Sequence, residues 1–257
     1  MVVHHSASHS APVTVVIPAR VGSSRFPGKP LAMLIGKPLI QHVYERAQAS
    51  PMIDQVLVAT DDARIRDTVQ GFGGTAVLMT EPFRTGTDRV AAVARQLPAQ
   101  VFVNLQGDEI ILHHELLADL LTPFLVSGAG MGTLKRRLTS TADVRNPGVV
   151  KVITDQQGEA LYFSRAPIPH VRDGAIESVA WLHYVHLGIY IYTRETLLRL
   201  AELPTSPLEE AEKLEQLRAL EHGVRIRVWE TTHPSLRIDT PEDLKEAEAI
   251  LQRPVPC

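Results

Sequence analysis

The stretch VTVVIPARVGSSRFPGKP, residues 13–30, decides the fold of this chain. Its first five residues, VTVVI, are apolar except for Thr14, which predicts a short buried strand. A loop rich in cations and glycines follows at 18–30, and the segment 38–49, which opens on a proline, has the apolar period of a helix. A strand, a loop and a helix in this order are the repeating unit of a parallel sheet.

The same alternation continues to about residue 130. Strands are expected at 55–59, 75–79 and 101–105, and helices at 63–71, 87–97 and 114–127. We therefore predict an α/β fold with a mixed, mainly parallel sheet and helices on both of its faces.

Beyond residue 130 the expected strands lie closer together, at 131–137, 149–154, 160–164 and 185–192. Such spacing favours antiparallel or mixed strands that extend the sheet. Two late helices, 207–220 and 241–251, bracket a strand at 225–229, and 167–183 is expected to be a loop that forms an arm. No repeat or linker divides the chain, so 13–257 is predicted to be a single domain.

Composition excludes several classes of protein. With 257 residues, 44% of them hydrophobic, and a formal charge of −3, the chain has no electropositive field for nucleic acid. No apolar run approaches the roughly 20 residues that span a bilayer, so no membrane is expected. Cys257 is the single cysteine, which favours a reducing cytoplasm. Residues 1–12 contain three histidines but no secretory pattern, and are expected to be a disordered leader.

The loop that leaves the first strand is the first place to look for a ligand, because ligands bind outside the carboxyl ends of parallel strands. It carries three cations, Arg20, Arg25 and Lys29, together with two glycines and two serines. Cations neutralise clustered negative charge and glycines let backbone amides approach closely, which favours a polyphosphate. The spacing of Gly22 and Gly28 does not match a Walker P-loop. The alternative is a solvated loop whose charges only maintain solubility.

One acidic segment could hold a metal ion, and a second one begins a helix. Asp108 and Glu109 follow the expected strand 101–105, and carboxylates at such an edge suit Mg²⁺. The alternative there is a turn or a helix cap. Asp239 lies in the segment IDTPED, residues 238–243, which by itself is only the start of a helix with a capping residue and a proline in its first turn.

Residues 15–30 resemble the signature of the 3-deoxy-manno-octulosonate (Kdo) cytidylyltransferases, and other motifs of that family follow in the right order along nearly the whole chain. The resemblance implies a Rossmann-like fold of the nucleotide-diphospho-sugar transferase type, and transfer of a cytidylyl group from CTP to an acidic sugar with release of pyrophosphate. Segment 103–109 resembles the family's V-N-V-Q-G-D-E, and 238–243 resembles V-D-T-P-E-D. These matches imply that Asp108 and Asp239 bind Mg²⁺ and that Gln106 contacts the sugar.

The resemblance also assigns the substrate contacts. It implies catalytic roles for Arg20 and Lys29 on the triphosphate, besides that of Asp108. The nucleotide-binding residues that it implies are Ala19, Arg20, Gly22, Ser23, Lys29, Thr60, Asp61, Thr85 and Arg89. The motifs YFSR at 162–165, HLGIYIY at 186–192 and PLEEAEKLEQLR at 207–218 add acceptor contacts. The implied acceptor-binding residues are Arg25, Gln106, Arg165, His186, Tyr190, Glu209 and Gln216, with Arg165 on the sugar carboxylate.

Two departures from the family pattern concern the acceptor. Ile110 stands where the family usually has proline, and Arg237 stands where it normally has glycine. They leave open another ulosonic or related acid, such as an amino-Kdo, as the acceptor. A non-catalytic nucleotide-binding module is the alternative from another class. The family is typically homodimeric, and we expect the contact between subunits around 160–200.

Overall fold

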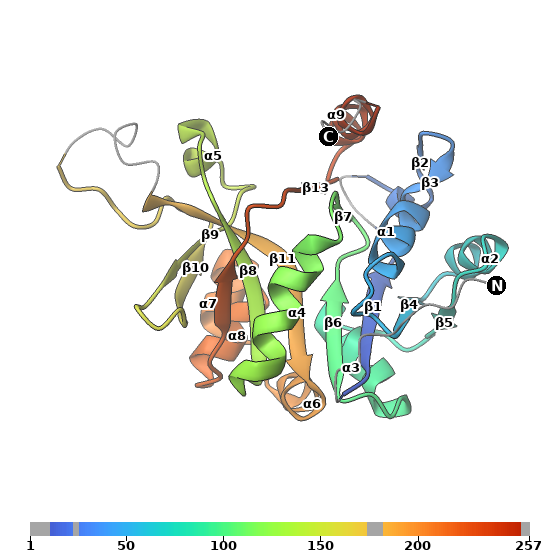
Figure 1. Cartoon of the computed structure of the whole chain (residues 1–257), viewed down its shortest axis with the longest axis horizontal. Coiled ribbons are helices and arrows are strands. Elements are labelled where there is room, and N and C mark those ends of the chain that lie inside the picture. The colour runs from blue at the N-terminus through green and yellow to red at the C-terminus, as the bar shows by residue number, and fades with distance from the viewer. Residues whose placement is uncertain (1–10, 23–25, 174–181, 253–257) are drawn as a thin grey trace.

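The computed structural model describes residues 11–22, 26–173 and 182–252. Most of its strands form one mixed sheet in the order β10-β9-β11-β6-β1-β4-β5, and β8 pairs with both β11 and β12 (Figure 1). The strands of this sheet are β1 (Val13–Ala19), β4 (Gln55–Thr60), β5 (Ala76–Leu78), β6 (Val101–Leu105), β8 (Met131–Arg137), β9 (Lys151–Thr154), β10 (Ala160–Ser164), β11 (Tyr184–Thr193) and β12 (Arg227–Glu230).

Strand β1 lies in the middle of the parallel half of the sheet. It pairs in parallel with β4 on one side and with β6 on the other, so that Val15 is level with Val56 and Val103. Residues 13–17 are all buried. A parallel strand that is covered on both faces needs apolar side chains at successive positions, which explains the apolar run.

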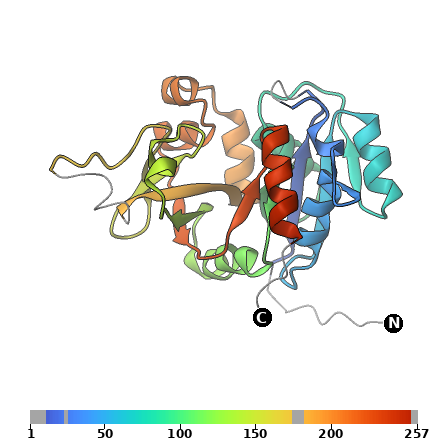
Figure 2. The same ribbon diagram turned by 90° about the horizontal axis from the view of Figure 1, so that it is seen from above.

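Helices cover both faces of the sheet, as predicted. On one face, α1 (Leu39–Gln48) and α4 (Glu115–Ser127) pack into a core with every second side chain of β1. On the other face, α3 (Gly86–Gln96), α6 (Arg194–Glu202) and α8 (Gln216–Glu221) form a second core. Two more helices, α2 (Ala63–Gly71) and α9 (Pro241–Leu251), belong to the first face, and Figure 2 shows α9 lying above the strand ends.

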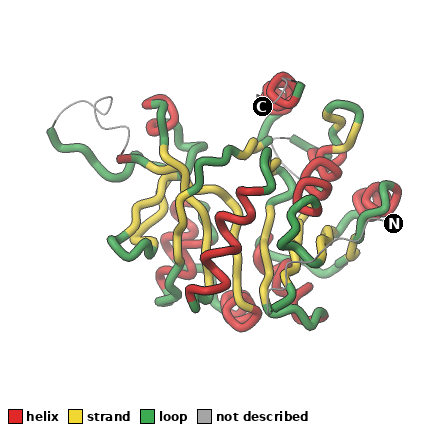
Figure 3. Tube along the Cα trace, viewed as in Figure 1, coloured by secondary structure: helices red, strands yellow, loops and turns green. Residues whose placement is uncertain are grey.

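The second half of the sheet is mixed, which confirms the predicted change of rhythm. Strand β11 is antiparallel to β6, β8 and β9, whereas β12 is parallel to β8. Figure 3 shows the strands in yellow with helices in red around them. Residues 166–173 lead away from β10 as a loop that extends beyond the sheet in Figure 1. No helix of the described residues is long and apolar enough to cross a bilayer.

One predicted helix is wrong in its extent. The segment 207–220 forms two short helices, α7 (Pro207–Glu212) and α8, because Lys213 adopts a left-handed conformation with φ of 53°. The nine-residue helix α6 was missed, and so were several short elements: the 3₁₀ turn η1 (Lys29–Leu31), the hairpin β2 (Met33–Leu34) and β3 (Lys37–Pro38), β7 (Glu109–Ile111), α5 (Thr141–Arg145) and β13 (Ser235–Arg237). Segments of two to five residues have too few positions to display a period.

Candidate active site

A small two-stranded sheet brings the two acidic segments together. Strands β7 and β13 pair antiparallel, with Ile110 level with Leu236. Just beyond this pair, the Ile238 N–H donates to the Asp108 carbonyl at 2.9 Å. Asp108 and Asp239 therefore flank the same end of the ladder, although they lie far apart in the sequence.

Ile110 has a structural role in this pairing. Its side chain is fully buried in the first core, where Ile238 also packs. In an antiparallel ladder, residues directly opposite one another alternate between hydrogen-bonded and non-bonded pairs, and a proline has no N–H to donate. Isoleucine thus suits a position that is both buried and paired.

The Lys29 ammonium lies between the two aspartates. Its Nζ is 2.5 Å from Asp108 Oδ2, 2.8 Å from the Ile238 carbonyl and 3.4 Å from Asp239 Oδ1. The Lys29 side chain is only 10% exposed. Three loops, those that follow β1, β6 and β13, thus converge on one buried cation.

The first loop is shaped by two glycines. Gly28 has a φ of 73° and begins η1, which aims Lys29 inward. Gly107 follows β6, and a Cβ there would lie 3.0 Å from the Pro18 carbonyl, so the absence of a side chain favours this close approach of the two strand ends. The resulting cleft has an empty volume of about 850 Å³, and Arg20, Lys29, Gln106, Asp108, Arg237 and Asp239 line it.

The residues assigned to the base and ribose gather beside this cleft. Arg89 Nη1 donates to the Ala19 carbonyl and Arg89 Nη2 to Asp61 Oδ2, each at 2.7 Å. Thr60 is fully buried at the end of β4, and Thr85 caps α3 by accepting from the Asp88 N–H at 3.1 Å. Arg89 therefore ties the first loop to the Asp61 loop and positions both of them.

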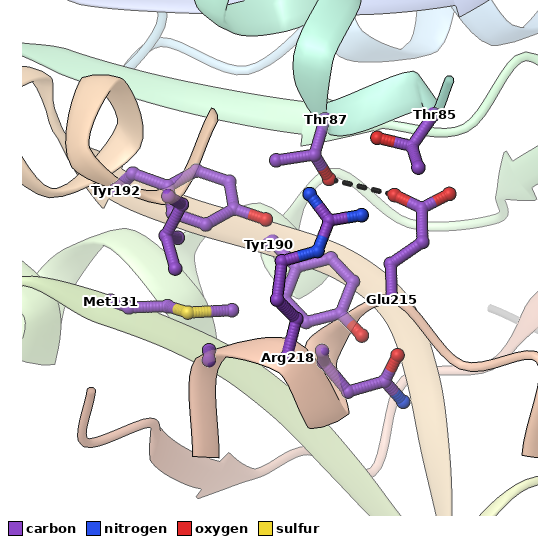
Figure 4. A pocket seen from close by; sticks show the side chains of 10 residues that line it. Thr85, Thr87, Met131, Tyr190, Tyr192, Glu215 and Arg218 are labelled. Carbon is purple, nitrogen blue, oxygen red and sulfur yellow. Dashed lines mark hydrogen bonds between the residues drawn. The ribbon is translucent and has the colours of Figure 1, made fainter. Parts of the chain in front are cut away.

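A second, smaller pocket lies beside strand β11 (Figure 4). Tyr190 and Gln216 line it, and the Tyr190 hydroxyl and the Gln216 amide nitrogen are buried with no hydrogen-bond partner among the described residues. Because buried polar groups are nearly always paired, these two groups are left for ordered water or a polar ligand to satisfy. Burial raises the pKa of Tyr190, which keeps its hydroxyl protonated as a donor.

Two further residues of this pocket escaped the sequence interpretation. Glu215 accepts from the Thr87 hydroxyl at 2.9 Å, as the dashed line in Figure 4 shows, and Arg218 closes the pocket beside it. Both belong to the quoted motif at 207–218, so the signal that could have identified them was already present.

Glu209 and Arg165 do not line any of the pockets described here. Glu209 is buried and pairs with Arg218 at 2.5 Å, and it also completes the capping box of α7. Arg165 donates to the carbonyls of Pro147 at 2.9 Å and Glu212 at 2.7 Å, with a longer contact to Lys213 at 3.4 Å. Both side chains hold the α7–α8 connection in place.

His186 lies on β11 at a third cavity, which adjoins the cleft. Its Nε2 is 3.0 Å from the Thr133 hydroxyl, which also lies 2.7 Å from the Ile189 carbonyl. A carbonyl can only accept, so the Thr133 hydroxyl donates its single proton to the Ile189 carbonyl. The Thr133 oxygen then accepts a hydrogen bond from Nε2–H of His186. This assigns the proton to Nε2 and leaves Nδ1 as an acceptor.

Burial, together with the Arg237 guanidinium, lowers the pKa of His186 from 6.5 to about 3. Between pH 6.5 and 3, His186 is therefore protonated in the unfolded chain but neutral in the folded chain. Because the unfolded chain binds the extra proton, the free energy of unfolding falls as the pH falls through that window. Between pH 7.5 and 5, this effect lowers the unfolding free energy of the wild-type chain by about 2 kcal/mol. His186→Gln is expected to lack this part of the acid destabilisation.

Urea unfolding of the two proteins at both pH values tests this prediction. His170→Gln, at an exposed position, is the control and should keep the wild-type slope. An unchanged acid slope in His186→Gln would show that this histidine is not held neutral by the fold.

The comparisons with known proteins agree with this geometry. A family model described as cytidylyltransferase matches residues 14–226. The chain belongs to the cytidylyltransferase family. It is 51% identical over 246 residues to a 3-deoxy-manno-octulosonate cytidylyltransferase of Syntrophotalea carbinolica, covering 93% of this chain and 98% of that protein. A protein of the same name from Geobacter sulfurreducens is 48% identical, covering 91% of this chain and 97% of the relative.

A solved structure extends the likeness to three dimensions. It is described as CMP:2-keto-3-deoxy-manno-octonic acid synthetase complexed with CTP, and it superposes with a TM-score of 0.86 at 40% identity, covering 94% of this chain and 98% of the other. The Rossmann-like fold and the family predicted from the motifs are thus confirmed. Ser23, Arg25, Cys257 and most of the N-terminal leader lie outside the described residues.

Proposed function

We propose that this cytidylyltransferase transfers a cytidylyl group from CTP to Kdo, forms CMP-Kdo and releases pyrophosphate. The observation that carries the proposal is the convergence of Asp108, Asp239 and Lys29 in one cleft at the strand ends. The neighbouring pocket, with its orphan hydroxyl and amide, supplies directional donors of the kind that a polyhydroxylated acceptor requires.

Mg²⁺ is the proposed cofactor, and Asp108 and Asp239 would hold it. Carboxylate oxygens suit a hard cation. Those of Asp108 and Asp239 already contact one positive charge, the Lys29 ammonium. Among the described residues no three His, Cys, Asp or Glu side chains gather in a way that could enclose a metal ion. Two carboxylates with the remaining ligands from water and phosphate oxygens are the usual arrangement for Mg²⁺. When bound, the ion supplies neutralisation of phosphate charge.

The chain's own residues then position the reactants. Arg20 and Lys29 face the triphosphate and neutralise the pyrophosphate as it leaves, while Arg89 fixes the loops around the base and ribose. The acceptor's anomeric oxygen forms a bond to the α-phosphorus in line with the breaking bond to the bridging oxygen of pyrophosphate, and its proton passes to solvent. Catalysis here rests mostly on positioning and charge neutralisation.

An acceptor panel tests the proposal. Pyrophosphate release is measured with CTP and Mg²⁺ against Kdo, 8-amino-Kdo, another ulosonic acid and a neutral sugar of the same size. We expect Kdo to give the highest kcat/KM, and Tyr190→Phe to raise the acceptor KM about tenfold with little change for CTP. Tight CTP binding without turnover on any acid would instead support the nucleotide-binding module.

Two further properties belong to the proposal. We propose a homodimer, with the subunit contact in the region 160–200, where the exposed Leu161 lies on β10 at the end of the sheet. A cytoplasmic location and a single domain over 13–257 stay predictions. Sedimentation of the intact chain would test the first of these properties.

A further inference from the structure

Arg237 stands at the boundary between two cavities. It lines the cleft that contains Lys29 and Asp108, and it also lines the third cavity, where His186 lies. Asp239 is the other residue common to both linings. Arg237 and Asp239 therefore stand where the cleft meets the third cavity.

Arg237 is paired with one aspartate and stays partly exposed. Its Nε is 3.1 Å from Asp239 Oδ2, and the side chain is 48% exposed. On the ladder it lies opposite Glu109, whose carboxylate accepts from the Ser235 hydroxyl. Arg237 thus makes its ion pair with Asp239 while about half of its side chain stays exposed where the two cavities meet. A guanidinium fork matches a carboxylate in a two-point contact.

The charges around the site require such a cation. Arg237 lies opposite Glu109 on the ladder, is paired with Asp239 and shares the lining of the cleft with Asp108. An acidic acceptor that enters beside Asp108 and Asp239 is repelled unless a cation faces it. Lys29 is held by both aspartates, whereas the field of Arg237 reaches the acceptor side, because it lowers the pKa of His186 and opposes the rise in that of Tyr190.

We propose that Arg237 binds the carboxylate of the acceptor and selects acidic sugars. This inference rests on the proposed function and changes one detail of it, because the sequence motifs assigned the carboxylate to Arg165. The Arg165 guanidinium donates to backbone carbonyls and lines neither cavity. Arg136 is the remaining rival, since it lines the third cavity and its Nε is buried without a partner among the described residues.

The test compares one acceptor with and without its charge. Pyrophosphate release at saturating CTP is measured for Kdo and for its primary amide at C1, with the wild-type chain, Arg237→Gln and Arg237→Lys. The wild-type chain is expected to prefer the acid about 100-fold in kcat/KM, and Arg237→Gln to reduce this preference below about 10-fold with the CTP KM within twofold. Arg237→Lys keeps the charge but loses the fork, so it should lie between them.

Direct binding and matched variants complete the test. Calorimetry with 2-deoxy-Kdo, which lacks the reacting hydroxyl, should show a weaker affinity in Arg237→Gln than in the wild-type chain. Arg225→Gln, at an exposed position on another surface, should bind this acid as the wild-type chain does. Arg136→Gln and Arg165→Gln are measured alongside. If either one abolishes the acid preference while Arg237→Gln retains it, the proposal is overturned.

The two possible failures can be told apart. A wild-type chain that releases no pyrophosphate with any acid refutes the proposed function, and this inference with it. A wild-type chain that uses the acid, together with an Arg237→Gln variant that keeps the full preference, refutes only the role of Arg237. If Arg237→Gln melts well below the wild-type chain, Arg237→Lys decides instead. A reduced ratio of kcat/KM for the acid over the amide in Arg237→Lys would support the role of Arg237, and an unchanged ratio would refute it.

Discussion

Asp108→Asn is expected to reduce turnover about 1,000-fold. The change keeps the size of the side chain but removes the charge that faces Lys29 at 2.5 Å and that would hold the metal ion. A metal ion contributes several kcal/mol to stabilising the charge that develops during phosphoryl transfer, and about 4 kcal/mol corresponds to three orders of magnitude in rate. Pyrophosphate release with CTP and Kdo measures this loss, and the binding of Mn²⁺ followed by electron paramagnetic resonance measures the site directly.

A matched control separates the local effect from the loss of one negative charge. Glu246→Gln removes the same charge from an exposed position of α9 and should retain wild-type rates and Mn²⁺ affinity. Asp239→Asn should resemble Asp108→Asn, because both carboxylates contact the same ammonium. Wild-type Mn²⁺ affinity in Asp108→Asn would show that this carboxylate is not a ligand.

The fold was predictable from the sequence where the signal is local. The apolar run 13–17 and the segments 101–105 and 131–137 are buried, and each forms a strand at the expected place. The extent of the helix at 207–220 was not predictable, because its apolar period continues through Lys213 although the backbone reverses there. A left-handed conformation at a lysine has no compositional signal.

The site was predictable as a set of residues but not as a set of contacts. Motifs named Asp108, Asp239 and Lys29, and the structure brings them together through the β7–β13 ladder. The ladder has only three residues on each strand, so no pattern in the sequence announces it. The different surroundings of Arg165 and Arg237 likewise depend on the path of the chain between helices, which the composition of each segment does not encode.

Lys29→Ala is expected to lower kcat/KM for CTP by 100-fold or more, because it removes a cation that faces the leaving pyrophosphate. It is also expected to change stability in a way that reports on the metal site. Without the ammonium, Asp108 and Asp239 face each other in a partly buried cleft, and removing one partner of such a pair costs about 3 kcal/mol. Thermal melting without divalent ions measures this loss.

Added Mg²⁺ should then restore the variant more than it stabilises the wild-type chain. In the wild-type chain the Lys29 ammonium and a divalent ion compete for the same carboxylate oxygens, whereas in Lys29→Ala the ion meets no competitor. Lys37→Ala is the control, since Lys37 forms an exposed pair with Glu45 at 2.6 Å, and surface pairs contribute only about 0–1 kcal/mol. Equal shifts of Tm with Mg²⁺ in wild type and Lys29→Ala would mean that lysine and metal do not share a position. A larger shift in Lys29→Ala would mean that the Lys29 ammonium and the metal ion compete for the same carboxylates in the wild-type chain.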